Sequence, residues 1–247
     1  MNDVKPGPRV LVIQPDRADP LDRFEAWLQG LGVQLTIVQP FSGHEVPSTL
    51  DADGLIVLGG KMGAYEDAAY PWLEDIRALQ RDAVAQGAPT LGICLGGQLL
   101  SQAFGGKVVL GNEGVEAGVV TVRTSGAVLD DPLLHGFGPE FPVASMHGDM
   151  IAALPDDAVL LGSSEDYPHQ AFRIADCAWG LQFHPEIAPT TYAVWAGIFS
   201  SPDPEEMRKV AEGVEELFEA DPSVRRTSAV IATRFAQLVG ASAGRIS

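Results

Sequence analysis

The sequence predicts an α/β fold with an open, mostly parallel sheet flanked by helices. Short apolar runs alternate with stretches of helical periodicity through the first hundred residues, and this alternation is typical of a parallel sheet that helices cover on both faces. Short strands separated by turn residues follow between about residues 107 and 183, and they predict antiparallel strands added to the same sheet. Beyond Pro189 only helical patterns remain, so we expect a helical C-terminal part.

The elements of the first half follow from apolar runs and helix-end signals. The centres of 9–14 and 54–58 are continuously apolar, as in strands that are buried on both faces. Residues 71–86 are amphipathic, with a proline at the start and Gly87 just after the end, which predicts a helix. We therefore expect strands at 9–14, 33–39, 54–58 and 89–93, and helices at 21–30, 71–86 and 95–104.

The second half predicts shorter strands and then helices. Asp203 and Pro204 form a typical helix start. We expect strands at 118–123, 141–144, 158–163, 170–174 and 179–183, helices at 192–199, 204–220 and 224–239, and a frayed end at 241–247. The expected organisation is a flexible lead at 1–8, one domain at 9–200, and a helical extension at 201–247 that packs on this domain.

Composition limits the partners and the compartment. The net charge of the 247 residues is −17, which argues against nucleic acid and anionic membrane as partners, because both bind basic surfaces. The only cysteines, Cys94 and Cys177, are too few for a disulfide scaffold or a cysteine-rich zinc site. The five histidines lack metal-ligand spacing, and neither a signal peptide nor a membrane-length apolar run is visible. We expect a cytoplasmic protein without metal or cofactor.

The segment 90–104 predicts a reactive cysteine at a sharp corner. It is an apolar strand that ends at Cys94, turns through glycines and continues as a helix. The pattern Gly92-Ile-Cys-Leu-Gly96 matches a nucleophile elbow with cysteine in place of serine. The helix start behind Cys94 favours thiolate over thiol and can hold an oxyanion, because its dipole and free N–H groups attract negative charge. A buried structural thiol is the alternative for a cysteine considered alone, and it is our interpretation of Cys177.

His184 and Glu186 predict a base and the carboxylate that orients it. They flank Pro185 at the exit of an apolar strand. Proline keeps the residue before it extended, and residues two apart in an extended chain point to the same side. Glu186 can then bind one ring nitrogen and leave the other to take a thiol proton. A purely structural histidine at a strand end is the alternative.

The glycine-rich loop after the strand at 54–58 predicts a site for negative charge. Glycines let a ligand approach the backbone and expose its N–H groups. The amides of Gly60 and Leu95 are therefore candidates for an oxyanion hole. A phosphate-binding loop does not fit, because Met62 follows Lys61 where that loop has serine or threonine. A simple turn after a strand is the other alternative.

Together these motifs resemble the class I glutamine amidotransferases. The resemblance lies in the Gly59-Gly60 loop, Gly92–Gln98 and Gln182–Glu186, which occur in the order of that family over roughly residues 50–187. The segments Met146-His-Gly-Asp149, Leu154-Pro155 and Gln170–Arg173 further resemble stand-alone relatives of the amidotransferase part of GMP synthase. The resemblance implies an open, three-layer, flavodoxin-like α/β fold and hydrolysis of the glutamine side-chain amide through a γ-glutamyl thioester.

The resemblance also implies residue roles. Cys94 is the implied nucleophile, His184 the base and then the acid, and Glu186 the orienting carboxylate. Gly60 and Leu95 supply oxyanion N–H groups, and the substrate-binding residues are Gly59, Gln98, Met146 and His147. Lys61 and Met146 stand where the GMP synthase pattern has proline and serine, which changes the shape of the pocket.

The implied substrate is L-glutamine or another γ-glutamyl amide. The pyrophosphatase-type Ser-Gly-Gly loop of the synthetase part is absent from the sequence, so we expect the ammonia acceptor to be a separate synthetase. A γ-glutamyl peptidase or hydrolase acting on a peptide or conjugate stays open, because the same triad cleaves either amide. A catalytically quiet regulatory subunit of a synthetase is a third possibility, and the intact triad argues against it.

Overall fold

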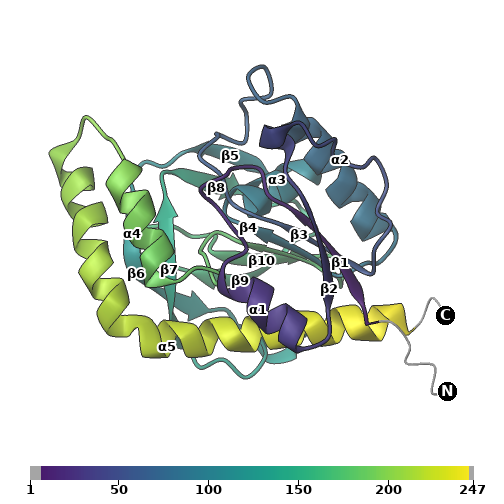
Figure 1. The fold of residues 1–247 in the computed structure, drawn as a ribbon. Helices are drawn as coiled ribbons and strands as arrows, with labels where there is room; N and C mark the ends of the chain where they lie inside the picture. The colour runs from purple at the N-terminus through teal and green to yellow at the C-terminus, as the bar shows by residue number, and fades with distance from the viewer. Residues whose placement is uncertain (1–6, 245–247) are drawn as a thin grey trace.

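The computed structural model describes residues 7–244 and has three layers, with helices on both faces of a sheet (Figure 1). The strands of the main sheet are β1 (Arg9–Ile13), β2 (Gln34–Val38), β3 (Gly54–Val57), β4 (Thr90–Ile93), β6 (Glu116–Thr124), β7 (Glu140–His147), β9 (Val159–Ser163), β10 (Ala171–Ile174) and β11 (Ala178–Leu181). The helices are α1 (Arg23–Gly30), α2 (Trp72–Ala85), α3 (Leu95–Ala103), α4 (Pro189–Ile198) and α5 (Pro204–Ala243).

The sheet has the order β2-β1-β3-β4-β11-β10-β9-β6-β7. The first five strands in this order pair in parallel. In β1, Val10 and Val12 belong to the core on one face, with residues of α1 and α5, while Leu11 and Ile13 belong to the core on the other face, with residues of α2 and α3. A strand that is apolar on both sides needs helices on both sides, and the predicted fold class is confirmed.

The remaining strands, β10, β9, β6 and β7, pair antiparallel, as expected from their short spacing. Two strands were not expected from the sequence. β5 (Lys107–Leu110) and β8 (Asp149–Ala153) form a separate antiparallel pair. Each contains a single buried residue, Val108 and Ile151 respectively.

Helix α5 corrects the expectation of two helices at 204–220 and 224–239. It is one helix of 40 residues with Pro222 inside it. Proline lacks the N–H and crowds the carbonyl four residues earlier, which typically bends a helix, and Figure 1 shows α5 as two arms that meet at a bend. The first arm runs beside β6, β7 and α4, and the second supplies Ile231, Phe235 and Val239 to the core.

Two smaller expectations concern the ends of the chain, and the described residues cover each of them only in part. Helix α5 continues to Ala243, so the fraying expected from residue 241 begins no earlier than residue 244. Residues 245–247, and residues 1–6 of the expected flexible lead, lie outside the described residues.

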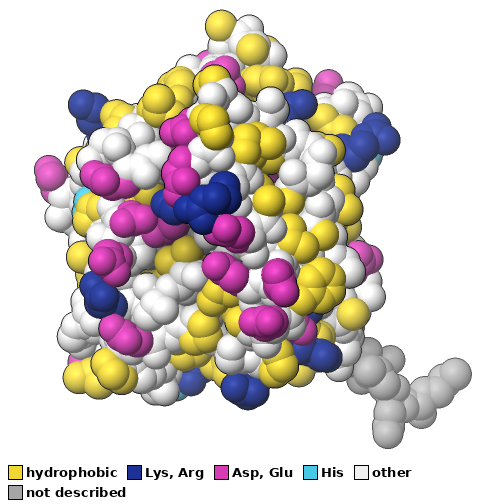
Figure 2. All heavy atoms as spheres, turned by 90° about the vertical axis from the view of Figure 1, so that its left-hand side faces the viewer, with side chains coloured by type: hydrophobic (Ala, Val, Ile, Leu, Met, Phe, Trp, Pro, Cys, Tyr) yellow, Lys and Arg dark blue, Asp and Glu magenta, His cyan; other side chains and the backbone are white. Residues whose placement is uncertain are grey.

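The face that carries α4 and the first arm of α5 is rich in acidic side chains (Figure 2). The first arm of α5 itself contains Glu205, Glu206, Glu212, Glu215, Glu216 and Glu219. Arg208 pairs with Glu205 and Glu212 within the arm. None of the helices between residues 7 and 244 combines the length and the apolarity needed to cross a bilayer.

Candidate active site

Cys94 occupies a strained corner between β4 and α3. Its backbone has φ 50° and ψ −109°, a region that residues with a side chain rarely adopt. Glycines allow the close packing around it. A Cβ on Gly92 would lie 2.4 Å from the carbonyl oxygen of Gly96, and a Cβ on Gly96 would lie 2.1 Å from that of Val57. The glycines of the elbow pattern are therefore needed for packing as well as for the turn.

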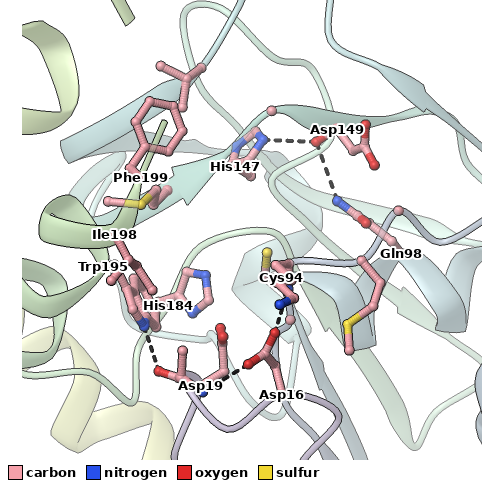
Figure 3. Close-up of a pocket in the computed structure, with 18 of the residues that line it drawn as sticks. Asp16, Asp19, Cys94, Gln98, His147, Asp149, His184, Trp195, Ile198 and Phe199 are labelled. Carbon is pink, nitrogen blue, oxygen red and sulfur yellow. Dashed lines mark hydrogen bonds between the residues drawn. The ribbon is translucent and has the colours of Figure 1, made fainter. Parts of the chain in front are cut away.

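His184 lies just after β11, and its backbone N–H donates to the carbonyl of Ala144 in β7 at 2.8 Å. Its ring Nδ1 donates to Glu186 Oε1 at 2.8 Å, and both side chains are fully buried. Figure 3 shows the ring beside the sulfur of Cys94. The structure therefore brings together Cys94, His184 and Glu186, the three residues that the sequence predicts to act together.

The surroundings of His184 favour its charged form. Burial, the largest single influence, lowers the pKa of the ring. The negative charges of Glu186 and Cys94, and their hydrogen bonds with the ring, outweigh burial and raise the pKa of His184 well above its usual range. An imidazolium next to a cysteine favours the thiolate.

The two residues predicted to supply oxyanion amides, Gly60 and Leu95, lie close to each other. Leu95 is the first residue of α3, so its N–H has no acceptor within the helix. Gly60 lines the same cavity as Cys94, and a Cβ on it would lie 2.9 Å from Leu95 Cδ2. Gly59 is not on the cavity wall. A Cβ there would meet Asp19 Oδ1 at 2.6 Å and His184 Cε1 at 2.9 Å, so Gly59 makes room for these two side chains.

The other predicted binding residues line the cavity on a different side of Cys94. Gln98 Nε2 donates to the carbonyl of Asp149 and to Gln182 Oε1, both at 3.3 Å. Gln182 Nε2 in turn donates to the Cys94 sulfur at 3.8 Å. Met146 and His147, at the end of β7, also line the cavity. The sequence places Gln182 within a motif, but no role was predicted for it.

His147 belongs to a buried network that was not predicted from the sequence. Its Nε2 lies 2.9 Å from Glu116 Oε2, and its Nδ1 lies 2.9 Å from the carbonyl oxygen of Asp149. Both partners are oxygen acceptors, so the ring is held between the Glu116 carboxylate and the Asp149 carbonyl. Ser164 and Gln170 also donate to Glu116. Glu116 is 31 residues from His147, and no motif spacing indicates such a pair.

The carboxylate of Glu116 is held in its charged form. Burial, its largest single influence, raises the pKa of Glu116. The hydrogen bond and charge of His147, with the hydrogen bonds from Ser164 and Gln170, outweigh burial and lower the pKa of Glu116 below its usual value. The Glu116 carboxylate therefore anchors the His147 ring at the wall of the cavity.

Asp19 is a second residue that was not predicted from the sequence. Burial raises its pKa to about 7. The charge of His184 lowers the pKa, and the charges of Asp16 and Glu186 raise it further. Asp16 and Asp19 both line the cavity (Figure 3). They follow β1 at the carboxyl edge of the parallel strands, where ligands bind in such sheets, and this position is a signal that could have identified them.

The cavity around Cys94 has a volume of about 1050 Å³, which is at the upper end of the range for ligand pockets. Among residues 7–244, no group of three or more His, Cys, Asp or Glu side chains is arranged to hold a metal ion. The residues that line the cavity near Cys94 include Asp16, Ala18, Asp19, Gly60, Gln98, Met146, His147, Asp149, His184, Trp195, Ile198 and Phe199.

Known proteins resemble this chain over most of the part that contains these residues. Residues 25–194 match the family model of class I glutamine amidotransferases. The chain is 35% identical to one of the subunits of the glutamine-hydrolysing GMP synthase of Halobacterium salinarum, over 58% of this chain and 72% of that protein. It is 34% identical to the glutamine-hydrolysing GMP synthase of Thermosipho africanus, over 61% of this chain but only 27% of that longer protein.

Solved structures agree with the sequence relatives. A glutamine amidotransferase of Thermotoga maritima superposes with a TM-score of 0.81 at 27% identity, over 94% of this chain and 97% of that one. A glutamine amidotransferase of Methylobacillus flagellatus superposes with a TM-score of 0.83 at 26% identity, over 94% and 95% of the two chains. The chain therefore belongs to the class I glutamine amidotransferase family.

Proposed function

We propose that this protein hydrolyses the side-chain amide of L-glutamine through a γ-glutamyl thioester on Cys94. The observation that carries the proposal is the buried series Cys94, His184 and Glu186. Glu186 binds Nδ1 of the ring at 2.8 Å, so Nε2 is the nitrogen left for proton transfer at the sulfur. The family membership supports glutamine as the substrate.

Acylation begins from the thiolate and the imidazolium. The Cys94 sulfur attacks the γ-carbonyl carbon, and the amides of Gly60 and Leu95 donate to the oxyanion that forms. As the C–N bond breaks, His184 gives its proton to the nitrogen, and ammonia leaves. The raised pKa of His184 suits this step, because the ring already carries the proton that the leaving group needs.

In deacylation the His184 ring accepts a proton, whereas in acylation it donates one. The now neutral His184 takes a proton from water, and the hydroxide formed attacks the thioester carbon. The C–S bond breaks, glutamate leaves, and the thiolate and imidazolium are restored. Glu186 keeps the ring orientation fixed through both steps.

The α-amino and α-carboxylate groups form the head group of glutamine, and we place them at the polar part of the cavity wall. Gln98 and the backbone at Met146 and His147 line the cavity together, and we assign them to the α-amino and α-carboxylate groups. The hydrogen bond between the His147 ring and Glu116 fixes this part of the backbone in place. Gly59 contributes indirectly, because a side chain there would displace Asp19 or His184.

The test is glutamate release from glutamine by the wild type, Cys94→Ala and Cys177→Ala. Cys177 is a matched control, because it is the other free cysteine and does not line the cavity. We expect turnover to fall by about 10⁴-fold or more in Cys94→Ala and to stay within twofold of wild type in Cys177→Ala. Undiminished turnover in Cys94→Ala would contradict the proposal.

We further propose that the ammonia passes to a separate synthetase chain, in the cytoplasm. Two relatives are themselves named as subunits of GMP synthase, which supports a partner chain, and a catalytic thiolate is best kept reduced in the cytoplasm. Addition of the synthetase chain from the same genome should raise glutaminase kcat at least tenfold and give a complex in size-exclusion chromatography. No complex and no change in kcat would contradict this part alone.

A further inference from the structure

The cavity is polar on one side of Cys94 and apolar on the other. Gln98, His147 and Asp149 form the polar side, while Trp195, Ile198 and Phe199 form the apolar side beyond His184 (Figure 3). Trp195 and Ile198 belong to α4, and Phe199 follows its last residue. Glutamine needs a place for its head group and for its carbonyl, but ammonia as a leaving group does not need an apolar wall.

The geometry of His184 places the apolar wall on the leaving-group side. The nitrogen that departs must take its proton from His184, so it lies on the His184 side of the reacting carbon. The His184 and Trp195 rings are in edge-to-face contact, with centroids 4.7 Å apart at 63°. A substituent on the departing nitrogen would therefore extend past His184 toward Trp195, and then toward Ile198 at the mouth, which is 67% exposed.

The polar side-chain atoms of Trp195 and His184 are already hydrogen-bonded, and Asp19 lines the cavity next to them. Trp195 Nε1 donates to the carbonyl of Ala18 at 2.6 Å, and His184 Nδ1 donates to Glu186. The neighbouring Arg17 directs its guanidinium over the ring of Phe41, 5.4 Å from the centroid. The wall thus presents ring faces and alkyl groups, which favour an apolar substituent over a charged one.

We propose that this enzyme also cleaves γ-glutamyl amides whose nitrogen carries an alkyl or aryl group, and that the wall of Trp195, Ile198 and Phe199 binds that group. The proposal rests on the thioester chemistry proposed above. The C–N bond breaks as Cys94 acylates, the amine leaves with the proton from His184, and water cleaves the thioester. The products are glutamate and an apolar amine in place of ammonia.

The direct experiment compares three substrates with the purified full chain by glutamate release. These are L-glutamine, L-γ-glutamyl-n-butylamide, and the γ-glutamyl amide of 4-aminobutyrate, which has the same chain length with a terminal carboxylate. Each buried methylene should raise kcat/KM by about fourfold, so we expect the butylamide to exceed both other substrates at least tenfold. A kcat/KM for the butylamide equal to or below that for glutamine would overturn the proposal.

A variant at the mouth tests the wall itself. Ile198→Asp should lower the ratio of kcat/KM for the butylamide to kcat/KM for glutamine by about tenfold. Leu129→Asp is the matched control, because Leu129 is 79% exposed and lies in a 3₁₀ helix (Gly126–Asp130) away from the cavity. It should leave the ratio unchanged. An equal ratio in Ile198→Asp and wild type would overturn the assignment of the wall.

The outcomes also separate this proposal from the one on which it rests. Glutamate release from glutamine that depends on Cys94, without cleavage of the butylamide, overturns the apolar-amine proposal and leaves the proposed function standing. If the butylamide is not cleaved and Ile198→Asp reduces the stimulation of glutaminase kcat by the synthetase chain, the wall of Trp195, Ile198 and Phe199 is a docking surface for that chain. Failure to release glutamate from any of the three substrates, with or without the synthetase chain, would overturn both.

Discussion

Two buried histidine–glutamate pairs flank the same cavity, and they differ in what the second ring nitrogen does. In one pair Nδ1 of His184 binds Glu186 at 2.8 Å, and in the other Nε2 of His147 binds Glu116 at 2.9 Å. The second nitrogen of His147 is bound to the carbonyl of Asp149. The second nitrogen of His184 is directed to Cys94, which can exchange a proton with it.

This difference separates a residue that can transfer protons from one whose two ring nitrogens are both engaged in structural hydrogen bonds. A general base needs a nitrogen that gains and loses a proton during the reaction. His147 cannot do so without leaving a buried acceptor unpaired, which costs about 1–3 kcal/mol. Composition and burial are nearly the same in the two pairs, so the group that contacts the second ring nitrogen decides the role of each histidine.

The largest expected effect comes from removal of the ring that can transfer protons. His184→Asn should lower kcat for glutamine hydrolysis by about 10⁴-fold, because acylation and deacylation both lose their proton carrier. Steady-state glutamate release measures the effect. The fold should survive, which circular dichroism checks. A kcat within tenfold of wild type would remove His184 from the mechanism.

The two glutamates should differ in which kinetic constant they change. Glu186→Gln should lower kcat by about 10²-fold, because the ring loses its orientation and its stabilising charge. Glu116→Gln should raise KM for glutamine by about tenfold with a smaller effect on kcat, because it removes the carboxylate that anchors the His147 ring at the substrate-binding wall. Both variants are measured in one kinetic series. The same change of kcat and KM in both would contradict the division of roles.

A smaller effect concerns Asp19, the second carboxyl beside His184 after Glu186. Folded Asp19 keeps its proton up to about pH 7, whereas unfolded Asp loses it near pH ~4. The folded state binds more protons between these values, so this group makes stability fall as pH rises. Asp19→Asn removes the effect, and its stability relative to wild type should rise by about 2 kcal/mol from pH 5 to pH 7.

Urea unfolding at both pH values measures the change for Asp19→Asn. Asp51→Asn is the control, because the Asp51 side chain is 95% exposed, and its difference from wild type should not depend on pH. A relative stability of Asp19→Asn that falls over this range would contradict a raised pKa for Asp19.

The fold and the nucleophile corner could be predicted because their signals are local. Apolar runs, the glycines around Cys94, and the separation of two between His184 and Glu186 all act over a few residues. Three features depended on tertiary contacts instead. The strands β5 and β8 form because they pair with each other. Helix α5 continues through Pro222, where sequence rules expect a break. Glu116 and His147 contact each other because they lie opposite one another on the paired strands β6 and β7.

Covalent labelling shows whether Cys94 is an activated nucleophile in a preformed glutamine site. The chain alone is treated with a diazoketone analogue of glutamine, digested, and measured by mass spectrometry. We expect one label per chain, on the peptide with Cys94, and we expect the labelling to be slowed by added glutamine and strongly reduced in His184→Asn. No label on Cys94, or equal labelling of Cys94 and Cys177, would contradict this expectation.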